Sequence, residues 1–213
     1  MKKLFLGIIL CLPMLAWAAE SRIDIARFSQ GEMTGWQTKI FSGETHYSFG
    51  TINGQMALRA VSNAAASGRY REIDIDLNKT PILNWSWVVN NTLPNINERT
   101  RDGDDYAARV YMVFSGGMAF WRTRAINYVW SSNQPINTHW RSAYTENVRM
   151  IAIESGEERL GEWINEQRNV RQDYRRLFGE EPGKMSAVAI MTDTDNSGAN
   201  ATAWYGDIWF GAE

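Results

Sequence analysis

The stretch DYAARVYMVF, residues 105–114, decides the fold class, because its side chains alternate in character with a period of two. That period is typical of a β-strand whose two faces meet different surroundings. Bulky apolar side chains occupy one face (Val110, Met112, Phe114), and the other face is mixed (Ala107, Arg109, Tyr111, Val113). We expect the first face to be buried in a core and the second to meet a ligand or a covering segment.

Nine further segments show the same alternation with β-branched and aromatic residues, and clusters of Gly, Asn, Ser and Pro separate them. They are IDIARF, HYSFGTI, QMALRAV, YREIDIDL, ILNWSWVV, INYVWS, VRMIAIES, AVAIMTD and TAWYGDIWF. Ten short strands at this spacing predict an all-β fold, a two-sheet antiparallel β-sandwich of the jelly-roll type. We expect residues 19–213 to form one such domain.

One short helix is predicted near residues 170–178, where Val170, Tyr174 and Leu177 recur at helical spacing. Gly179 follows at the position where a helix commonly ends in the left-handed conformation. The helix is the one departure from the strand pattern in the sequence after the N-terminal segment.

The N-terminal segment, residues 1–18, has the pattern of a secretory signal peptide. Two lysines precede the apolar run of residues 4–15, which is too short to span about 30 Å of hydrocarbon. Small residues, Ala16 and Ala18, stand at the expected cleavage site. We therefore expect a periplasmic or secreted protein with no membrane insertion after cleavage. Cleavage removes the only cysteine, Cys11, and with it disulfide and thiol chemistry.

Charge and motifs exclude several function classes. Without the two lysines of the signal, 20 basic residues stand against 24 acidic ones, a net charge of −4, and no basic cluster is present. Nucleic acid is therefore not an expected partner. His46 and His139 lack other ligands at zinc spacing. The chain also lacks a nucleophile elbow, a P-loop and a dinucleotide-binding fingerprint.

Two other predicted strands repeat the division between a bulky face and an alanine-containing face. In VRMIAIES, Ile151 and Ile153 oppose Met150, Ala152 and Glu154, and in AVAIMTD, Val188 and Ile190 oppose Ala187, Ala189, Met191 and Asp193. Small side chains leave space for a ligand, and a few polar or aromatic groups can orient it. We predict a groove on this face, with the candidate ligand-binding residues Asp105, Arg109, Tyr111, Asn127, Trp130, Glu154 and Asp193.

The alternative is that a loop or helix covers the alanine-containing face and that Arg109 and Glu154 are simply paired, since long charged side chains are rarely buried alone. In either case we expect these two residues to be neighbours on one sheet, with their charged groups within salt-bridge reach. Asp105 and Arg109 are four residues apart on one strand, about 13 Å, so each needs a partner from another strand. Asp102 is expected in a solvated turn.

The loop TDTDNSG, residues 192–198, has the start of a calcium-binding pattern. Asp193, Asp195 and Ser197 stand at positions one, three and five, and Gly198 at position six allows the sharp turn. These three residues are the candidate ligands of a Ca²⁺ ion.

The calcium pattern is incomplete, because Trp204 occupies position twelve, where an EF-hand loop has a carboxylate. A bound cation would need a distant carboxylate, such as Asp207 or one of the residues 102–105. The alternative is an Asx-type turn in which Asp195 or Asn196 caps its own backbone.

Several of these stretches in combination resemble a bacterial family known as domain of unknown function 3047. They are DGDDYAARVYMVF, INYVW, the helix D-Y-R-x-L-F-G, AIMTDTDNSG and AWYGDIWF. That resemblance implies no activity. The F-x-x-G-E-x-x-G-W pattern at residues 28–36 and the terminal G-D-I-x-F strand are also similar in layout to galactose-binding-like jelly rolls. This second resemblance implies a carbohydrate-binding-like module, often with a structural calcium.

Three hypotheses for function follow. The first is a secreted or periplasmic module that binds a glycan or a small polar ligand on the alanine-containing face. The second is a glycan-cleaving hydrolase on the same face, with Glu154 and either Asp105 or Asp193 as its acid and base. The third is an envelope-associated domain that binds another envelope protein and no small ligand. We favour the first, so an enzyme is not the leading expectation, and Ca²⁺ is the only cofactor considered.

Overall fold

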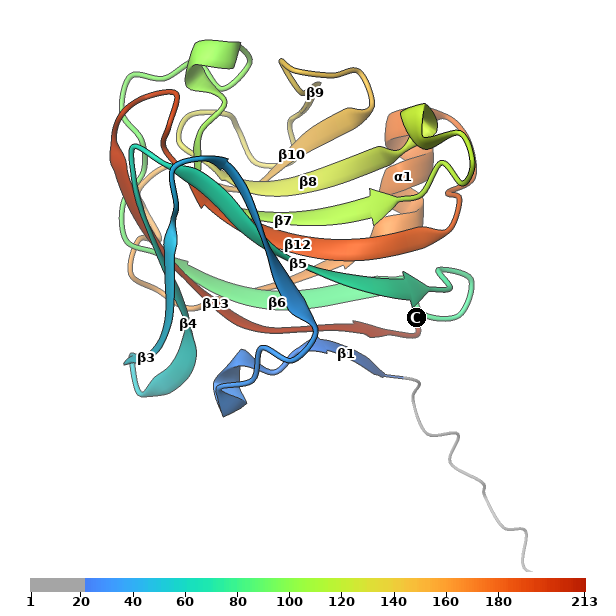
Figure 1. Cartoon of the computed structure of the whole chain (residues 1–213), viewed down its shortest axis with the longest axis horizontal. Helices are drawn as coiled ribbons and strands as arrows, with labels where there is room; N and C mark the ends of the chain where they lie inside the picture. The colour runs from blue at the N-terminus through green and yellow to red at the C-terminus, as the bar shows by residue number, and fades with distance from the viewer. Residues whose placement is uncertain (1–21) are drawn as a thin grey trace, which may run out of the picture.

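The computed structural model describes residues 22–213, so the predicted signal peptide, residues 1–18, lies outside the described residues. Within the described range the strands form two sheets stacked face to face (Figure 1). The two-sheet β-sandwich predicted from the sequence is confirmed. No helix among residues 22–213 combines the length and the apolar character needed to cross a membrane.

The six-stranded sheet lies at the bottom of Figure 1. Its strands are, in spatial order, β11 (Ile164–Asn169), β6 (Ile82–Val89), β13 (Asn200–Gly211), β4 (Gln55–Asn63) and β3 (His46–Ile52), with β1 (Ile23–Ala26) paired to β13. Three short 3₁₀ helices lie in connections of the fold: η1 (Phe28–Gln30), η2 (Arg101–Gly103) and η3 (Phe120–Arg122).

The seven-stranded sheet lies above it in Figure 1 and contains most of the candidate site residues. Its strands are, in spatial order, β2 (Trp36–Ser42), β5 (Ala66–Ile75), β12 (Met185–Asp193), β7 (Tyr106–Phe114), β8 (Arg124–Ser131), β10 (Val148–Ser155) and β9 (His139–Arg141). Strands β8 and β10 run parallel, whereas the other paired strands of the described residues are antiparallel. The predicted antiparallel arrangement therefore holds except between β8 and β10.

Each of the ten predicted strand segments corresponds to a strand of the structure, and β2, β9 and β11 are additional. Strand β11, with the sequence INEQRN, has one large apolar residue, and β9 has three residues in all. Neither is long or apolar enough to show a period of two. Both lie at sheet edges, where a strand is paired on one side only.

The predicted helix is confirmed as α1 (Val170–Phe178). The side chain of Asn169 accepts a hydrogen bond from the backbone N–H of Gln172 at 2.9 Å and so caps the N-terminus. Gly179 ends the helix with φ 74°, a conformation that glycine adopts without strain. The ring of Tyr174 packs 4.5 Å from that of Phe114, so the helix is fixed against the core.

The core lies between the two sheets and is rich in aromatic rings. Trp85 stacks on Tyr128 with ring centroids 5.4 Å apart, and Trp87 meets Trp130 edge-on at 6.0 Å. All four are buried. Trp85 and Trp87 are thus core residues. The prediction that Trp130 binds a ligand is wrong. Its side chain points into the core toward the other sheet.

Candidate functional site

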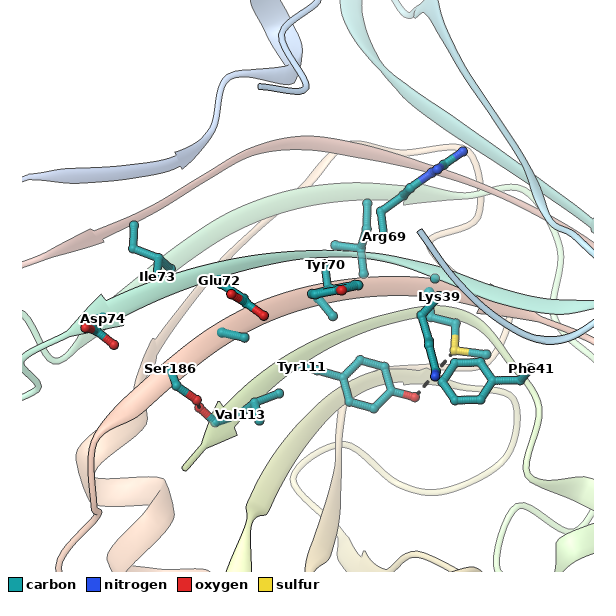
Figure 2. A pocket seen from close by; sticks show the side chains of 15 residues that line it. Lys39, Phe41, Arg69, Tyr70, Glu72, Ile73, Asp74, Tyr111, Val113 and Ser186 are labelled. Atoms are coloured by element: carbon teal, nitrogen blue, oxygen red, sulfur yellow. Dashed lines mark hydrogen bonds between the residues drawn. The ribbon is translucent and has the colours of Figure 1, made fainter. Parts of the chain in front are cut away.

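The outer face of the seven-stranded sheet contains a cavity of about 730 Å³, the first cavity, which is the one drawn in Figure 2. Val110, Met112 and Phe114 of β7 belong to the core, whereas the alternate residues Tyr111 and Val113 line this cavity. The cavity therefore lies on the alanine-containing face predicted from the sequence. Its floor has small residues (Gly68, Ala187, Ala189), and larger side chains stand around them (Lys39, Phe41, Tyr70, Glu72, Asp74, Tyr111, Met191).

The register of the sheet places two tyrosines on either side of one alanine. Ala189 of β12 is paired with Tyr70 of β5 on one side and with Tyr111 of β7 on the other. Two strand spacings, roughly 9–10 Å, separate the two tyrosine backbones. Figure 2 shows their rings in the cavity, with Phe41 beside Tyr111. The result is a shallow floor bordered by aromatic rings.

A second cavity of about 430 Å³ adjoins the first. Phe41, Tyr111 and Met191 line both cavities, so the two form one groove across the sheet. The additional lining of the second cavity is mostly polar, with Ala66, Val148 and Met150 as apolar members. The polar members include Asp104, Arg109, Asn127, Tyr144, Asp193, Asp195 and Asn196. The groove therefore has an apolar part over β5 and β12 and a polar part over β7 and β8.

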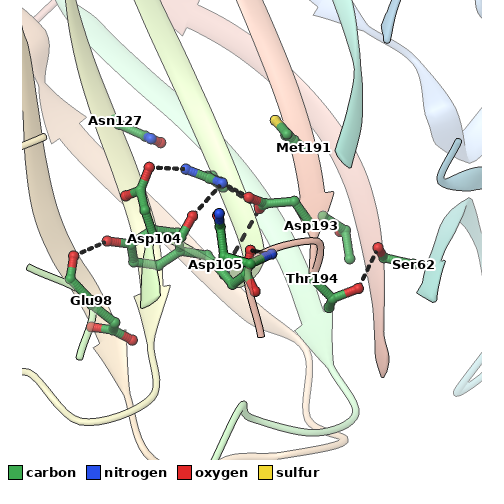
Figure 3. Close-up of polar contacts among 12 residues, drawn as sticks. Ser62, Glu98, Asp104, Asp105, Asn127, Met191, Asp193 and Thr194 are labelled. Carbon is green, nitrogen blue, oxygen red and sulfur yellow. Dashed lines mark hydrogen bonds and ion pairs between the residues drawn. The ribbon is translucent and has the colours of Figure 1, made fainter. Parts of the chain in front are cut away.

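Arg109 is the centre of the polar part. Its Nε donates to Asp193 Oδ1 at 2.6 Å, and a second guanidinium nitrogen pairs with the other oxygen of the same carboxylate (Figure 3). Asp104 lies 3.8 Å away on the other side. The guanidinium also lies over the ring of Tyr106, 4.6 Å from its centroid. Arg109 has an exposed fraction of only 4%, so these contacts replace its water shell.

The expected pair of Arg109 and Glu154 does not form. The two residues belong to the same sheet, but Glu154 pairs with Arg159 at 2.7 Å. A β-bulge between Ala152 and Glu154 breaks the alternation of β10 at this point. In the described structure neither cavity of the groove is lined by Glu154. The predictions that Glu154 binds a ligand in the groove and that it acts there as an acid or base are therefore wrong.

Asp105 lies at the end of the groove and fixes the loop of residues 193–198. Its two carboxylate oxygens accept the backbone N–H groups of Ser197 at 2.6 Å and of Asn196 at 3.2 Å. Asp105 is fully buried, whereas Asp102 in the preceding 3₁₀ turn is exposed, as expected. The loop is thus held by a carboxylate from a distant part of the chain.

Three carboxylates meet at this loop, because oxygens of Asp105, Asp193 and Asp195 lie within 4.8 Å of one another. Burial and the nearby charge of Asp105 raise the pKa of Asp195 above its usual range. The predicted ligand Ser197 is bonded to one of these carboxylates, since its backbone N–H donates to Asp105 at 2.6 Å. The distant carboxylate that a metal would need is thus Asp105.

The donor set of this cluster does not favour Ca²⁺. Calcium takes six to eight oxygen ligands, and carboxylates supply most of its charge compensation. Here Asp193 is already neutralised by Arg109, and Asp105 already accepts two N–H groups. A cation between them would lie beside a buried guanidinium. The carboxylates of Asp105 and Asp193 are better explained as the anchors of a hydrogen-bonded turn than as calcium ligands.

Asn127 and Tyr111 lie side by side in the groove, as register partners on β8 and β7. Asn127 is almost fully buried, and its amide nitrogen meets the sulfur of Met150 at 3.5 Å. Tyr111 donates to the sulfur of Met191 at 3.7 Å, a weak bond. Burial raises the pKa of Tyr111, so its hydroxyl is a neutral donor and acceptor.

Of the seven predicted ligand-binding residues, Arg109, Tyr111, Asn127 and Asp193 line the groove and Asp105 supports its rim. Lys39, Phe41 and Tyr70 also line it and were missed. Asp104, one of the carboxylates at residues 102–105 that the sequence analysis considered, lines it as well. Lys39 and Phe41 belong to β2, which was not predicted as a strand. Alternation along YREIDIDL was the available signal for Tyr70, Glu72 and Asp74, since these residues share one face.

The fold and the groove define a class: a β-sandwich module with a ligand-sized groove on the outer face of one sheet. A family model described as "Protein of unknown function (DUF3047)" matches residues 34–209, and the chain belongs to this family. No curated protein matches the chain at a significant level.

Solved structures show similar folds at low sequence identity. The family 30 carbohydrate-binding module of the cellulosomal cellulase Cel9D-Cel44B of Clostridium thermocellum is 10% identical, with a TM-score of 0.51 over 91% of this chain and 98% of that one. TmCBM61 in complex with beta-1,4-galactotriose is also 10% identical, with a TM-score of 0.44 over 88% and 94%. The K2 cleaved adhesin domain of Lys-gingipain is 13% identical, with a TM-score of 0.45 over 89% and 99%.

Proposed function

We propose that this protein is a secreted or periplasmic module that binds a glycan chain in the groove of its seven-stranded sheet. The observation that supports the proposal is the first cavity, in which a floor of Gly68, Ala187 and Ala189 lies among the aromatic side chains of Phe41, Tyr70 and Tyr111. A sugar ring has apolar C–H faces and hydroxyl edges. It can stack on such rings only where small residues leave it room.

The exposure of Phe41 supports a binding role. Its side chain is 65% exposed at the border of the first cavity, so the ring is available for contact with a ligand. Lys39 lies 6.0 Å from the centroid of the same ring. Lys39, Glu72 and Asp74 are exposed around the cavity and can bond the hydroxyl edges of a sugar.

The fold supports the same class of function. The family 30 carbohydrate-binding module has this two-sheet architecture over nearly its whole length. At 10% identity this likeness concerns the fold alone, so the assignment depends on the groove.

The hydrolase hypothesis has weaker support in the geometry. Glycoside hydrolysis needs one carboxyl that donates a proton and a second that attacks or activates water, both open to the substrate. Asp105 and Asp193 are fully buried and already bonded, and Glu154 is paired with Arg159 outside the groove. The domain that only binds an envelope protein would not require the aromatic-bordered cavity.

A glycan array probed with the purified mature protein tests the proposal. We expect binding to a subset of oligosaccharides, and Phe41→Ala should weaken it by about tenfold or more, since a central aromatic contact is commonly worth ~1.4 kcal/mol or more. Phe49→Ala is the matched control, because Phe49 is a partly exposed phenylalanine on β3 of the other sheet. Absence of binding to any glycan, or equal loss in both variants, would overturn the proposal.

A further inference from the structure

The second cavity has a charge that the glycan proposal does not yet explain. Its lining includes the carboxylates of Asp104, Asp193 and Asp195 and the single guanidinium of Arg109, a formal net charge of −2 when all three carboxylates are ionised. Burial raises the pKa of Asp104 and of Asp195, and the nearby guanidinium of Arg109 opposes this rise. The other lining residues of this cavity are uncharged. An anionic ligand would therefore be repelled, and a cationic one attracted.

Two buried oxygens of this cavity lack donors. Within residues 22–213, neither Asp104 Oδ1 nor Asn127 Oδ1 has a hydrogen-bond partner. Asp104 is 7% exposed and Asn127 is 1% exposed, and both residues line the second cavity. Buried acceptors without donors are rare and costly, because they have lost water and gained nothing in exchange. A ligand in the cavity that donates hydrogen bonds would remove this cost.

The two oxygens are distinct from the carboxylate cluster at the loop. That cluster consists of Asp105, Asp193 and Asp195, and neither Asp104 nor Asn127 belongs to it. Asp104 comes from the turn before β7, and Asn127 comes from β8. Aromatic side chains, Phe41, Tyr111 and Tyr144, line the same cavity. Carboxylates, amide oxygens and ring faces together are the surroundings that a substituted ammonium group prefers.

We propose that the second cavity is a subsite for the ammonium group of an amino sugar, so that the groove selects glycans that contain unacetylated amino sugars. This inference rests on the proposed glycan binding in the first cavity. The sugar ring would stack near Phe41 and Tyr111, which border both cavities, and its amine would donate to Asp104 and Asn127. A hydroxyl in place of the amine could donate one hydrogen bond but would leave the charge uncompensated.

Calorimetric titration in a buffer with a chelator tests the inference. The probes are glucosamine oligomers, their N-acetylated counterparts and glucose oligomers of the same length. We expect the glucosamine oligomers to bind about tenfold tighter or more than either neutral series, as for a charged hydrogen bond in a partly buried site. Asp104→Asn should reduce this preference to near unity. Asp24→Asn, which removes an exposed carboxylate from β1 of the other sheet, should leave it unchanged.

Asn127→Leu gives a second readout, since Asp104→Asn also alters the surroundings of Arg109. It removes one acceptor without a change of charge, and we expect it to weaken the amine-bearing oligomers more than the neutral ones. Equal affinity for all three series, or a preference that both variants retain, would overturn the inference while glycan binding stands. Failure of every oligosaccharide on the array to bind would instead overturn the proposed function itself.

Discussion

Arg109 on β7 and Asp193 on β12 form a buried ion pair across adjacent strands at the polar end of the groove, with Nε and Oδ1 2.6 Å apart. Asp193 also accepts the backbone N–H of Tyr106 at 3.4 Å. The pair joins the two central strands of the sheet just where the loop of residues 193–198 leaves it. The sequence indicated that Arg109 needs a partner from another strand. We expected Glu154 on β10, and the structure shows Asp193 on β12.

Because Arg109 and Asp193 are paired and buried, replacing Arg109 alone should destabilise the protein more than replacing both residues. Arg109→Met should lower the free energy of unfolding by ~3–5 kcal/mol, because it leaves buried carboxylates uncompensated. Arg109→Met combined with Asp193→Asn should lose less than Arg109→Met alone. Urea denaturation of the variants measures both.

The exposed pair of Arg22 and Asp24 offers the control for this experiment. Arg22 Nε and Asp24 Oδ1 are 2.7 Å apart, but both side chains are partly exposed, so Arg22→Met should cost no more than about 1 kcal/mol. If the stability loss of the Arg109→Met, Asp193→Asn double variant equals the sum of the losses of the two single variants, the buried pair is not coupled and the account is wrong.

Glu166 on β11 should make stability depend on pH. Burial and the nearby charge of Glu154 raise the pKa of Glu166 from its ordinary value of 4.5 to about 7. The folded state therefore keeps a proton that the unfolded state loses. Stability should decrease as pH rises through the window from about 4.5 to about 7, and the loss should be complete above it.

Glu166→Gln should flatten this part of the profile and raise the melting temperature at pH 8 relative to the wild type. Melting curves between pH 4 and pH 8 measure the effect, with Glu44→Gln, at an exposed loop position, as the control. A wild-type stability that rises across the window and a variant that is less stable at pH 8 would contradict the assignment.

Calcium should leave the melting temperature unchanged, because Asp105 and Asp193 already have partners in the loop cluster. A ligand that binds only the folded state at a hundred times its dissociation constant would add ~2.7 kcal/mol. Such binding would raise the midpoint by several degrees in a domain of this size. A rise with calcium over chelator in the wild type, absent in Asp195→Ala, would show that the loop is a metal site.

Local signals in the sequence predicted the elements of the fold well. The helix at residues 170–178 has an amphipathic pattern and a glycine at its end, so its bounds could be read directly. The strands that cross the centre of a sheet have long alternating segments. Strands β9 and β11 could not be predicted, because β9 has three residues and β11, INEQRN, has one large apolar residue, so neither shows a period of two.

The candidate site was predicted less completely, since it depends on contacts between distant strands. Alternation assigned Arg109, Tyr111 and Asp193 to the groove face correctly. It failed for Glu154, because a β-bulge in β10 interrupts the period of two and has no signature in the residues around it. The assignment also failed for Trp130, because alternation along RAINYVWS places Trp130 and Asn127 on opposite faces of β8, so both could not face the groove. Phe41 was missed because it directly follows Ile40, so that the apolar residues of WQTKIFS do not alternate with a period of two.

The most direct test of glycan binding in the groove is a titration followed by nuclear magnetic resonance of the backbone amides. An oligosaccharide that binds on the array is added to the isotope-labelled mature protein. We expect the largest shifts at Gly68, Ala187 and Ala189, the small residues of the floor, and at Phe41 beside them. Shifts confined to the six-stranded sheet or to the outer edge of β9 would contradict the account, because the glycan would then bind elsewhere on the molecule.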